Sequence, residues 1–259
     1  MSRRRLADKW HRLLQSDPGT PRPRPGYASR MTALRSILSS SALIVLAAAP
    51  SHSVAAQSPE AILARAVSAY TGASTIAVRF SQTISNPLTG RTLATTGELS
   101  RQRPNLLSIS FDGKDPDRIV ADGSSLWVYL PSSAPGQVMR MPAIAAGGGM
   151  PIDPMGQILS APAGSYDVVG AGTAAVSGHA THAITLTPRS RASMFTSATV
   201  WVDDANGLVR QLESREQSGL VRRIVVTSYR TNVTIPRSTF DFTPPPNVRI
   251  VDAASMAAR

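Results

Sequence analysis

The strongest constraint on the fold is a change of hydrophobic period near residue 75. Between Ile76 and Ile84 the even-numbered residues are apolar except Gln82, and most odd-numbered residues are polar. Successive side chains of a β-strand point to opposite faces of a sheet. The alternation therefore predicts a strand with one buried face.

Similar β-rich segments follow along the rest of the chain, and Asp122-Gly123, Asn206-Gly207 and Ser218-Gly219 separate some of them as hairpin turns. We expect strands at 92–101, 103–111, 118–121, 125–130, 137–141, 166–169, 174–177, 183–187, 196–202, 208–216, 220–229 and 240–242. We expect about ten or eleven strands in all, in a single antiparallel sheet that curls toward a barrel without closing. No linker or internal repeat divides this region.

A helix is predicted before the strands, over Pro59–Thr71. Ser58 can cap its first turn and Pro59 suits the first helical position. Gly72 can end it. The apolar positions recur at helical spacing and form one stripe: Ile62, Leu63, Ala66, Val67 and Tyr70.

The first 56 residues have the pattern of an export signal. A short apolar stretch, 36–49, follows Arg30 and Arg35, and small residues follow at 53–56. We expect a secretory signal peptide cut after Ala56, which leaves 57–259 as a single periplasmic domain. Met31 begins an ordinary signal sequence and is a candidate true start.

Charge and cysteine content narrow the function further. Of the formal net charge of +11, residues 1–56 carry +7, so the remaining residues have no strongly basic face and we expect no nucleic-acid partner. The chain has no cysteine. This excludes disulfides, thiolate metal sites, cysteine nucleophiles and attachment of a lipid through an N-terminal cysteine.

Residues 142–165 interrupt the strands with several glycines and prolines. One short helix fits there, capped by Asp153, and its apolar face would hold Met155, Ile158 and Leu159. We expect a mobile, partly helical insertion.

Catalytic and metal-binding motifs are sparse in 57–259. His179 and His182 lie at a predicted turn without a nearby third ligand, and Asp203-Asp204 is most simply a hairpin tip. The sequence contains no nucleophile elbow, P-loop or dinucleotide fingerprint. We expect no catalytic residue, no metal and no cofactor, and a secreted hydrolase is the enzymatic alternative.

Five short motifs follow one another along the chain: Phe80-Ser81-Gln82, Gly97-Glu98-Leu99, Arg103–Leu107, Ala121–Tyr129 and Phe240–Pro245. In this order and spacing they resemble one protein family, the LolA periplasmic carriers of outer-membrane lipoproteins. The resemblance covers most of 58–252. It implies an unclosed antiparallel barrel with a helical lid over an apolar cavity. It also implies acylated lipoproteins as cargo, received from a LolCDE-type transporter and passed to a LolB-type receptor. Residues 142–182 depart from the family pattern because they are richer in glycine and proline.

The resemblance also suggests site residues. Arg103 matches the family arginine that bonds the lid backbone in the closed state, and our strand assignment places it on the face of Leu107. The other interpretation of Arg103 is a solvent-facing side chain at a strand end. Leu107 stands where the family usually has an aromatic residue. We expect the acyl-chain cavity to be lined by some of Ile62, Val67, Phe80, Leu107, Ile109 and Phe111.

Other functions of the same fold remain open. A periplasmic lipid-binding sensor or regulator of the RseB class is one alternative, although such sensors carry an additional C-terminal domain for which we see no room after Pro244–Pro246. A LolB-type receptor would need an N-terminal cysteine. We expect the carrier to be a monomer.

Overall fold

The structure is a computed structural model that describes residues 57–142 and 153–252. The predicted signal peptide and the candidate start at Met31 lie outside the described residues. Helix α1 (Pro59–Gly72) begins where the sequence predicts, and the Ser58 hydroxyl accepts a hydrogen bond from the Ala61 amide at 3.2 Å. Ile62, Ala66 and Tyr70 of the predicted stripe are buried.

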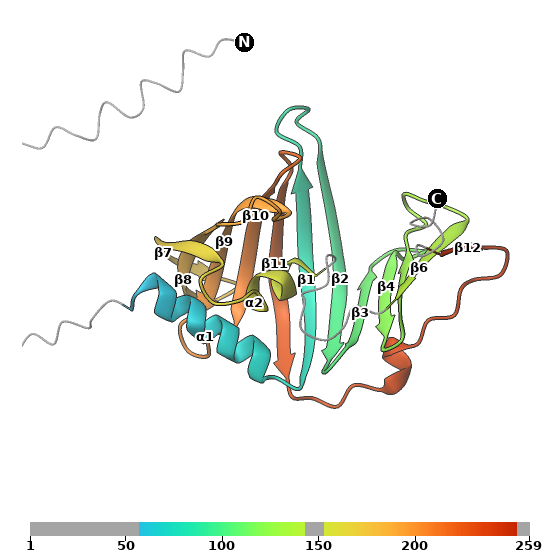
Figure 1. Cartoon of the computed structure of the whole chain (residues 1–259), viewed down its shortest axis with the longest axis horizontal. Helices are drawn as coiled ribbons and strands as arrows, with labels where there is room; N and C mark the ends of the chain where they lie inside the picture. Colours follow the sequence, from blue (N-terminus) through green and yellow to red (C-terminus); the bar gives the residue numbers. More distant parts are fainter. Residues whose placement is uncertain (1–56, 143–152, 253–259) are drawn as a thin grey trace, which may run out of the picture. The chain divides into compact units, whose positions relative to one another are not determined.

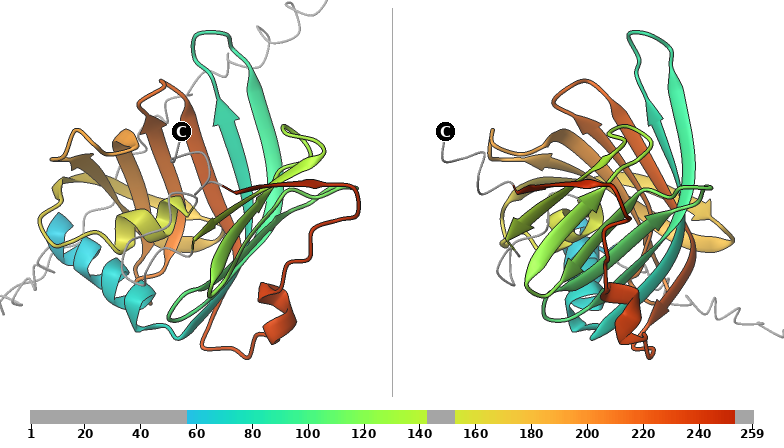
Figure 2. Two further views of the ribbon diagram at one scale, coloured as in Figure 1. Left: turned by 45° about the vertical axis from the view of Figure 1, so that its right-hand side comes forward. Right: turned by 90° about the vertical axis from the view of Figure 1, so that its right-hand side faces the viewer.

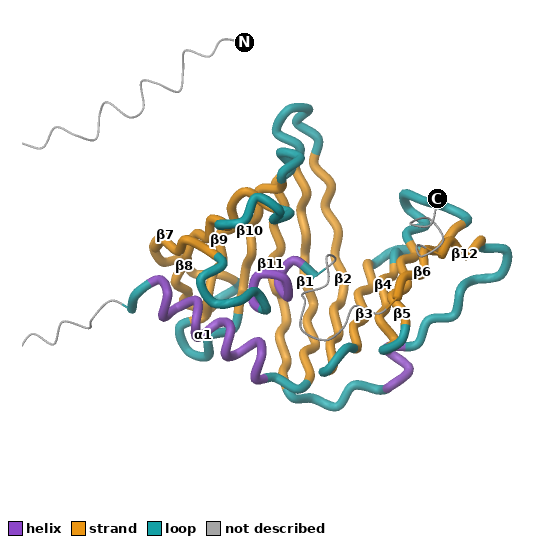
Figure 3. Tube along the Cα trace, in the orientation of Figure 1, coloured by secondary structure: helices purple, strands orange, loops and turns teal. Residues whose placement is uncertain are grey.

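Twelve strands of the described residues form one sheet (Figures 1 and 3). They are β1 (Thr75–Ser85), β2 (Thr92–Gln102), β3 (Leu106–Phe111), β4 (Arg118–Asp122), β5 (Ser125–Tyr129), β6 (Gln137–Pro142), β7 (Tyr166–Val176), β8 (His179–Pro188), β9 (Phe195–Asp203), β10 (Val209–Glu216), β11 (Val221–Thr231) and β12 (Arg249–Asp252). Their order in the sheet is β12-β6-β5-β4-β3-β2-β1-β11-β10-β9-β8-β7. All neighbours pair antiparallel except β12 and β6. The sheet is open, which confirms the predicted fold class.

Strands β1 and β2 form the longest hairpin, with paired residues from Thr75 and Gln102 to Ser85 and Thr92. Its far end stands clear of the neighbouring strands (Figure 1). Gly97 of β2 lets the Phe80 ring of β1 and the Ser110 carbonyl of β3 lie close to its backbone. A Cβ atom at this position would be 3.0 Å from the Phe80 ring and 2.5 Å from the Ser110 carbonyl. The Phe80 ring consequently lies across β2 and meets Phe111 edge to face at 5.8 Å.

Four details of the predicted strands are wrong. The segments 166–169 and 174–177 belong to one strand, β7, whose register against β8 shifts between Gly170 and Thr173. Residues 103–105 form a turn before β3. Strand β12 was not predicted, because its parallel pairing with β6 joins segments more than a hundred residues apart.

The fourth error concerns residues 240–242, where the structure has a 3-10 helix, η1 (Arg237–Phe240), and then irregular backbone. Phe240 is fully buried, and Phe242 packs on Trp127 at 5.7 Å between ring centroids. Two aromatic residues that pack against the protein with one residue between them imitate strand alternation, although the backbone joins no ladder.

Helix α2 (Pro154–Leu159) forms within the predicted insertion, and Asp153 is its cap. The preceding part of that insertion, 143–152, lies outside the described residues. Figures 1 and 2 show α1 and α2 on the same, concave side of the sheet. Helix α1 contacts α2 and the strands β7, β8 and β9. The two helices and the concave face bury one continuous apolar core.

Candidate apolar binding cavity

A cavity lies between α2 and the middle of the sheet. Its walls come from the C-terminal end of α1, the start of α2, and strands β1, β2, β3 and β11. The lining residues are Tyr70, Ile76, Val78, Phe80, Gln82, Leu99, Ile109, Phe111, Asp153, Pro154, Met155, Ile224, Val226 and Tyr229. The volume is about 60 Å³, which is room for only a few water molecules. A long acyl chain does not fit this volume, and we call this conformation, in which α2 and the last turn of α1 border the cavity, the closed state.

The structure brings three of the predicted cavity residues together. Phe80, Ile109 and Phe111 line the cavity. Ile62, Val67 and Leu107 pack in the adjoining core without lining it.

The position of α1 explains this difference. The helix begins beside β7, where Pro59 lies 3.6 Å from the Cβ position of Gly170, and only its last turn reaches the cavity through Tyr70. Among the predicted lid residues, Met155 lines the cavity, and Ile158 and Leu159 are buried in the core beneath α2.

The sequence signalled several further lining residues. Ile76, Val78 and Gln82 share the parity of Phe80 within β1. Ile224 and Val226 occupy β11, which pairs with β1. Alternation identifies the inner face of each strand, but only the order of the strands shows which part of that face meets the cavity.

A buried polar contact joins the two helices at the cavity wall. The Tyr70 hydroxyl of α1 donates to Asp153 Oδ2 at 3.1 Å, and Asp153 Oδ1 accepts the Gly156 amide at 2.9 Å. A Cβ atom at Gly156 would lie 2.3 Å from the carboxyl group and 2.7 Å from the Tyr70 hydroxyl. Glycine at this position is therefore what lets α2 approach α1 so closely.

Burial raises the pKa values of both side chains in this contact. It raises the pKa of Asp153, although the hydrogen bonds to the carboxyl group and the Arg101 cation oppose the change. It also raises the pKa of Tyr70, and the neighbouring Asp153 carboxyl adds to that effect. The Arg101 guanidinium lies 4.3 Å from the centre of the Tyr70 ring and donates to the Tyr70 carbonyl at 3.3 Å.

Arg103 does not share the inner face with Leu107. It is exposed in the turn between β2 and β3, and Leu107 is paired instead with Arg101 of β2. The Arg103 guanidinium donates to the Thr71 carbonyl in the last turn of α1. Arg101 and Arg103 therefore both bond backbone carbonyls at the end of α1 that borders the cavity.

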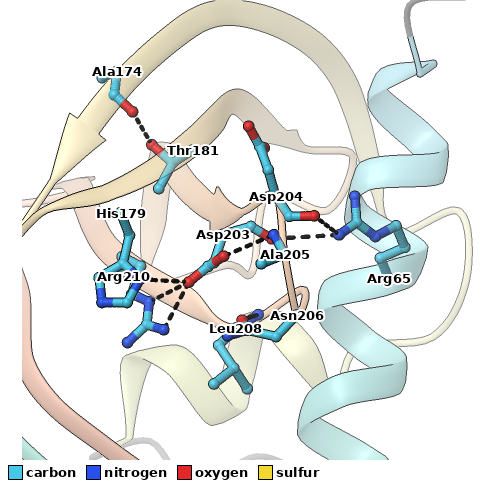
Figure 4. A network of polar contacts seen from close by, with 10 residues as sticks. All are labelled: Arg65, Ala174, His179, Thr181, Asp203, Asp204, Ala205, Asn206, Leu208 and Arg210. Carbon is cyan, nitrogen blue, oxygen red and sulfur yellow. Dashed lines mark hydrogen bonds and ion pairs between the residues drawn. The ribbon is translucent and has the colours of Figure 1, made fainter.

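A polar network holds the middle of α1 to the sheet (Figure 4). Arg65 of α1 donates to the carbonyls of Asp203 and Asp204, at 3.4 and 2.8 Å, in the turn between β9 and β10. The buried Asp203 carboxylate accepts from Arg210 at 2.7 Å and lies 3.0 Å from His179 Nδ1. The network anchors α1 away from the cavity and leaves its last turn to the contacts of Tyr70 and Thr71.

The two histidines have partners that the sequence did not reveal. His182 Nδ1 lies 2.6 Å from the Asp204 carboxylate, so each histidine pairs with one residue of the Asp203-Asp204 turn. In the part of the chain that the structure describes, no group of three or more His, Cys, Asp or Glu side chains could hold a metal ion.

These features define a class of protein: an open, curled antiparallel sheet whose concave face holds an apolar cavity beneath two helices. The chain belongs to the family described as "Outer membrane lipoprotein carrier protein LolA", which matches residues 71–243, more than half of its 259 residues. The match confirms the resemblance seen in the sequence motifs. A comparison with curated proteins gives no match.

Solved structures resemble the chain more distantly. A LolA superfamily protein from Nitrosomonas europaea is 14% identical, with a TM-score of 0.37, over 72% of this chain and 99% of that one. An uncharacterized conserved protein from Thermus thermophilus is 12% identical, with a TM-score of 0.46, over 76% and 99%. The Mycobacterium tuberculosis lipoprotein LppX is 15% identical, with a TM-score of 0.41, over 68% and 97%. These similarities are too low to carry a functional argument.

Within 57–142 and 153–252, no helix combines the length and apolar character needed to cross a membrane.

Proposed function

We propose that this protein is a periplasmic carrier that shields the acyl chains of lipoproteins and ferries them from the inner membrane to an outer-membrane receptor. The observation that carries the proposal is the apolar cavity closed by α1 and α2, in a chain of the LolA family. On this proposal the cargo comes from a LolCDE-type transporter and goes to a LolB-type receptor. The protein acts as a monomer, and it is a carrier and not an enzyme.

The energetics of exposed acyl chains require such a carrier. Burying one methylene group contributes about 0.8 kcal/mol, so three acyl chains of roughly sixteen carbons represent about 35 kcal/mol of exposure to water. Free passage of a lipoprotein through an aqueous compartment is therefore negligible. A protein cavity that takes up the chains removes this barrier.

Release needs a cost that opposes binding. In the closed state the cavity holds about 60 Å³, so cargo must displace α2 or the last turn of α1 before its chains are buried. The interactions that opening breaks subtract from the net affinity. The hydrogen bond from Tyr70 to Asp153 is one of these interactions, and its re-formation favours release to the receptor.

The test is a transfer assay with one matched pair of variants. Met155 on α2 lines the cavity, and Met139 on β6 is partly exposed and lies outside it. Met155→Glu places a charge in the cavity and should lower the affinity for a fluorescent acylated peptide at least tenfold. Met139→Glu should leave the affinity unchanged, and thermal melts of both variants show that they are folded.

Each outcome has a distinct meaning. Acyl binding together with transfer to vesicles that carry a LolB-type receptor supports the carrier. Binding without transfer would favour a lipid-binding sensor or regulator of the same fold, and cleavage of the acylated peptide would favour a hydrolase. If the Met155→Glu variant binds as well as the unchanged protein, the acyl chains do not enter this cavity.

A further inference from the structure

One polar side chain of the cavity lining, Tyr229, is not hydrogen-bonded to another described residue. Tyr229 of β11 is paired with Val78 of β1 and lines the cavity. Within the residues that the structure describes, its hydroxyl makes no hydrogen bond. The other polar lining groups do: Tyr70 bonds Asp153, and the Gln82 amide oxygen accepts from Arg222 at 2.9 Å.

The Tyr229 hydroxyl is a permanent hydrogen-bond donor. Burial and the neighbouring Asp153 carboxyl raise the pKa of Tyr229 to about 12, so the group keeps its proton at any physiological pH. No buried side-chain polar atom of the described residues lacks a partner, so the Tyr229 hydroxyl is open to water. A ligand that supplies an acceptor at this point takes the place of that water in the hydrogen bond.

The surroundings of Tyr229 restrict the head group of such a ligand. The Asp153 carboxyl lies close enough to influence the Tyr229 hydroxyl, and it caps α2 at the lid end of the cavity. The Arg101 cation at this end already lies over the Tyr70 ring. A neutral acceptor fits between these groups without requiring another ion pair.

The remaining walls restrict the body of the ligand. Apart from Tyr229, the cavity is lined mainly by aliphatic and aromatic side chains of the sheet: Val78, Phe80, Leu99, Ile109, Phe111 and Val226. Such walls accept a hydrocarbon chain. A single donor at the lid end of an apolar cavity thus matches a chain with one neutral carbonyl at its head.

We propose that the Tyr229 hydroxyl donates a hydrogen bond to the ester or amide carbonyl that joins an acyl chain to the cargo. The cavity then distinguishes an acyl linkage from a plain hydrocarbon of the same length. This inference rests on the proposed function, since it assumes that acyl chains enter the cavity when α2 is displaced. Tyr229 positions the head of each chain at the lid, and the sheet binds its tail.

The experiment compares two ligands of equal length by displacement of a fluorescent fatty-acyl probe. Methyl palmitate carries the ester carbonyl, and octadecane has a chain of the same length without a hydrogen-bond acceptor. Tyr229→Phe should weaken the binding of methyl palmitate about three- to tenfold, which is the range expected of one hydrogen bond. The same substitution should leave the binding of octadecane unchanged.

Tyr166 supplies the matched control. It is half-buried against the same core but does not line this cavity, and its ring stacks on Phe195 at 6.0 Å. Tyr166→Phe should bind methyl palmitate as tightly as the unchanged protein. Equal binding of methyl palmitate by Tyr229→Phe and the unchanged protein, or an equal loss of octadecane binding in Tyr229→Phe, would overturn the role of Tyr229 and leave the proposed function intact. If neither compound displaces the probe from any form of the protein, the proposed function fails as well.

Discussion

Replacing Tyr70 by Phe removes one hydroxyl group from the contact between α1 and α2. The aromatic ring stays beneath Arg101, and Asp153 keeps its hydrogen bond from the Gly156 amide. The substitution therefore tests the hydrogen bond between Tyr70 and Asp153 with little change in packing. We expect it to make opening of the cavity easier.

The size of the effect follows from the strength of one hydrogen bond. A hydrogen bond to a carboxyl group contributes about 1–3 kcal/mol, with the larger value for the ionised form. Its loss raises the ratio of open to closed protein about 5- to 150-fold. While the closed state still predominates, the apparent affinity for acyl chains rises by the same factor, because only the open state binds them.

Two measurements check this prediction, because the affinity for acyl chains should rise and the thermal stability should fall. Titration with a fluorescent acyl probe should show tighter binding, by about tenfold, in Tyr70→Phe. Thermal unfolding without ligand should show lower stability, by about 1 kcal/mol or more, because the same hydrogen bond is absent from the native state. Tyr129→Phe is the control, since its hydroxyl lies 3.3 Å from Asp115 Oδ1 and the residue does not line the cavity.

The changes in stability and in acyl affinity, taken together, can refute this prediction. If Tyr70→Phe loses stability and also loses affinity, the hydroxyl supports the binding-competent form and not the closed state. If the affinity stays unchanged although the stability falls, the two helices do not separate when acyl chains bind.

Three more predictions concern the lid and the leader. Arg103→Leu should bind acyl chains roughly tenfold more tightly and transfer them more slowly, because the hydrogen bond to the Thr71 carbonyl is lost. Arg103→Lys should bring the affinity and the transfer rate only part of the way back to those of the unchanged protein, since lysine lacks the planar fork of the guanidinium group. The affinity for acyl chains should rise as the pH increases from the ordinary pKa of Asp153, 3.8, through its raised value. Above that value the buried carboxyl group of the closed state is charged, which destabilises the closed state relative to the open state that binds the chains. The facing groups are the Arg101 guanidinium and the hydroxyls of Tyr70 and Tyr229, whose raised pKa values keep them protonated. Asp153→Asn should abolish the pH dependence. N-terminal sequencing of the exported protein should begin at Gln57, and an uncleaved, membrane-extracted chain would contradict the signal peptide.

Local patterns were sufficient for most of the fold. Ser58, Pro59 and the apolar stripe identify α1 because capping and helical spacing depend on neighbours within a few residues. Glycine turns delimit several hairpins for the same reason. The short strand β12 is invisible to such patterns because Arg249–Asp252 becomes a strand only through its distant parallel partner, β6.

The candidate site was less predictable than the strands around it. The sequence identifies Asp153 as a helix cap, but the partner of its second oxygen, Tyr70, lies 83 positions earlier in the chain. Nothing local distinguishes Tyr229, because a tyrosine near the end of a strand has many possible environments. The prediction that Arg103 lies on the inner face is wrong because β3 begins three residues later than expected; the actual register gives that place to Arg101.

The order of the strands has a mechanical consequence for the lid. Strands β6 and β7 are consecutive in the chain, yet β7 lies at one edge of the sheet and β6 lies next to the opposite edge. Helix α2 belongs to the connection between them and ends only a few residues before the edge strand β7 begins. The backbone therefore links the lid directly to an edge of the sheet, and not to the strands β1, β2, β3 and β11 that line the cavity. A ligand that displaces α2 acts on that edge as well as on the cavity.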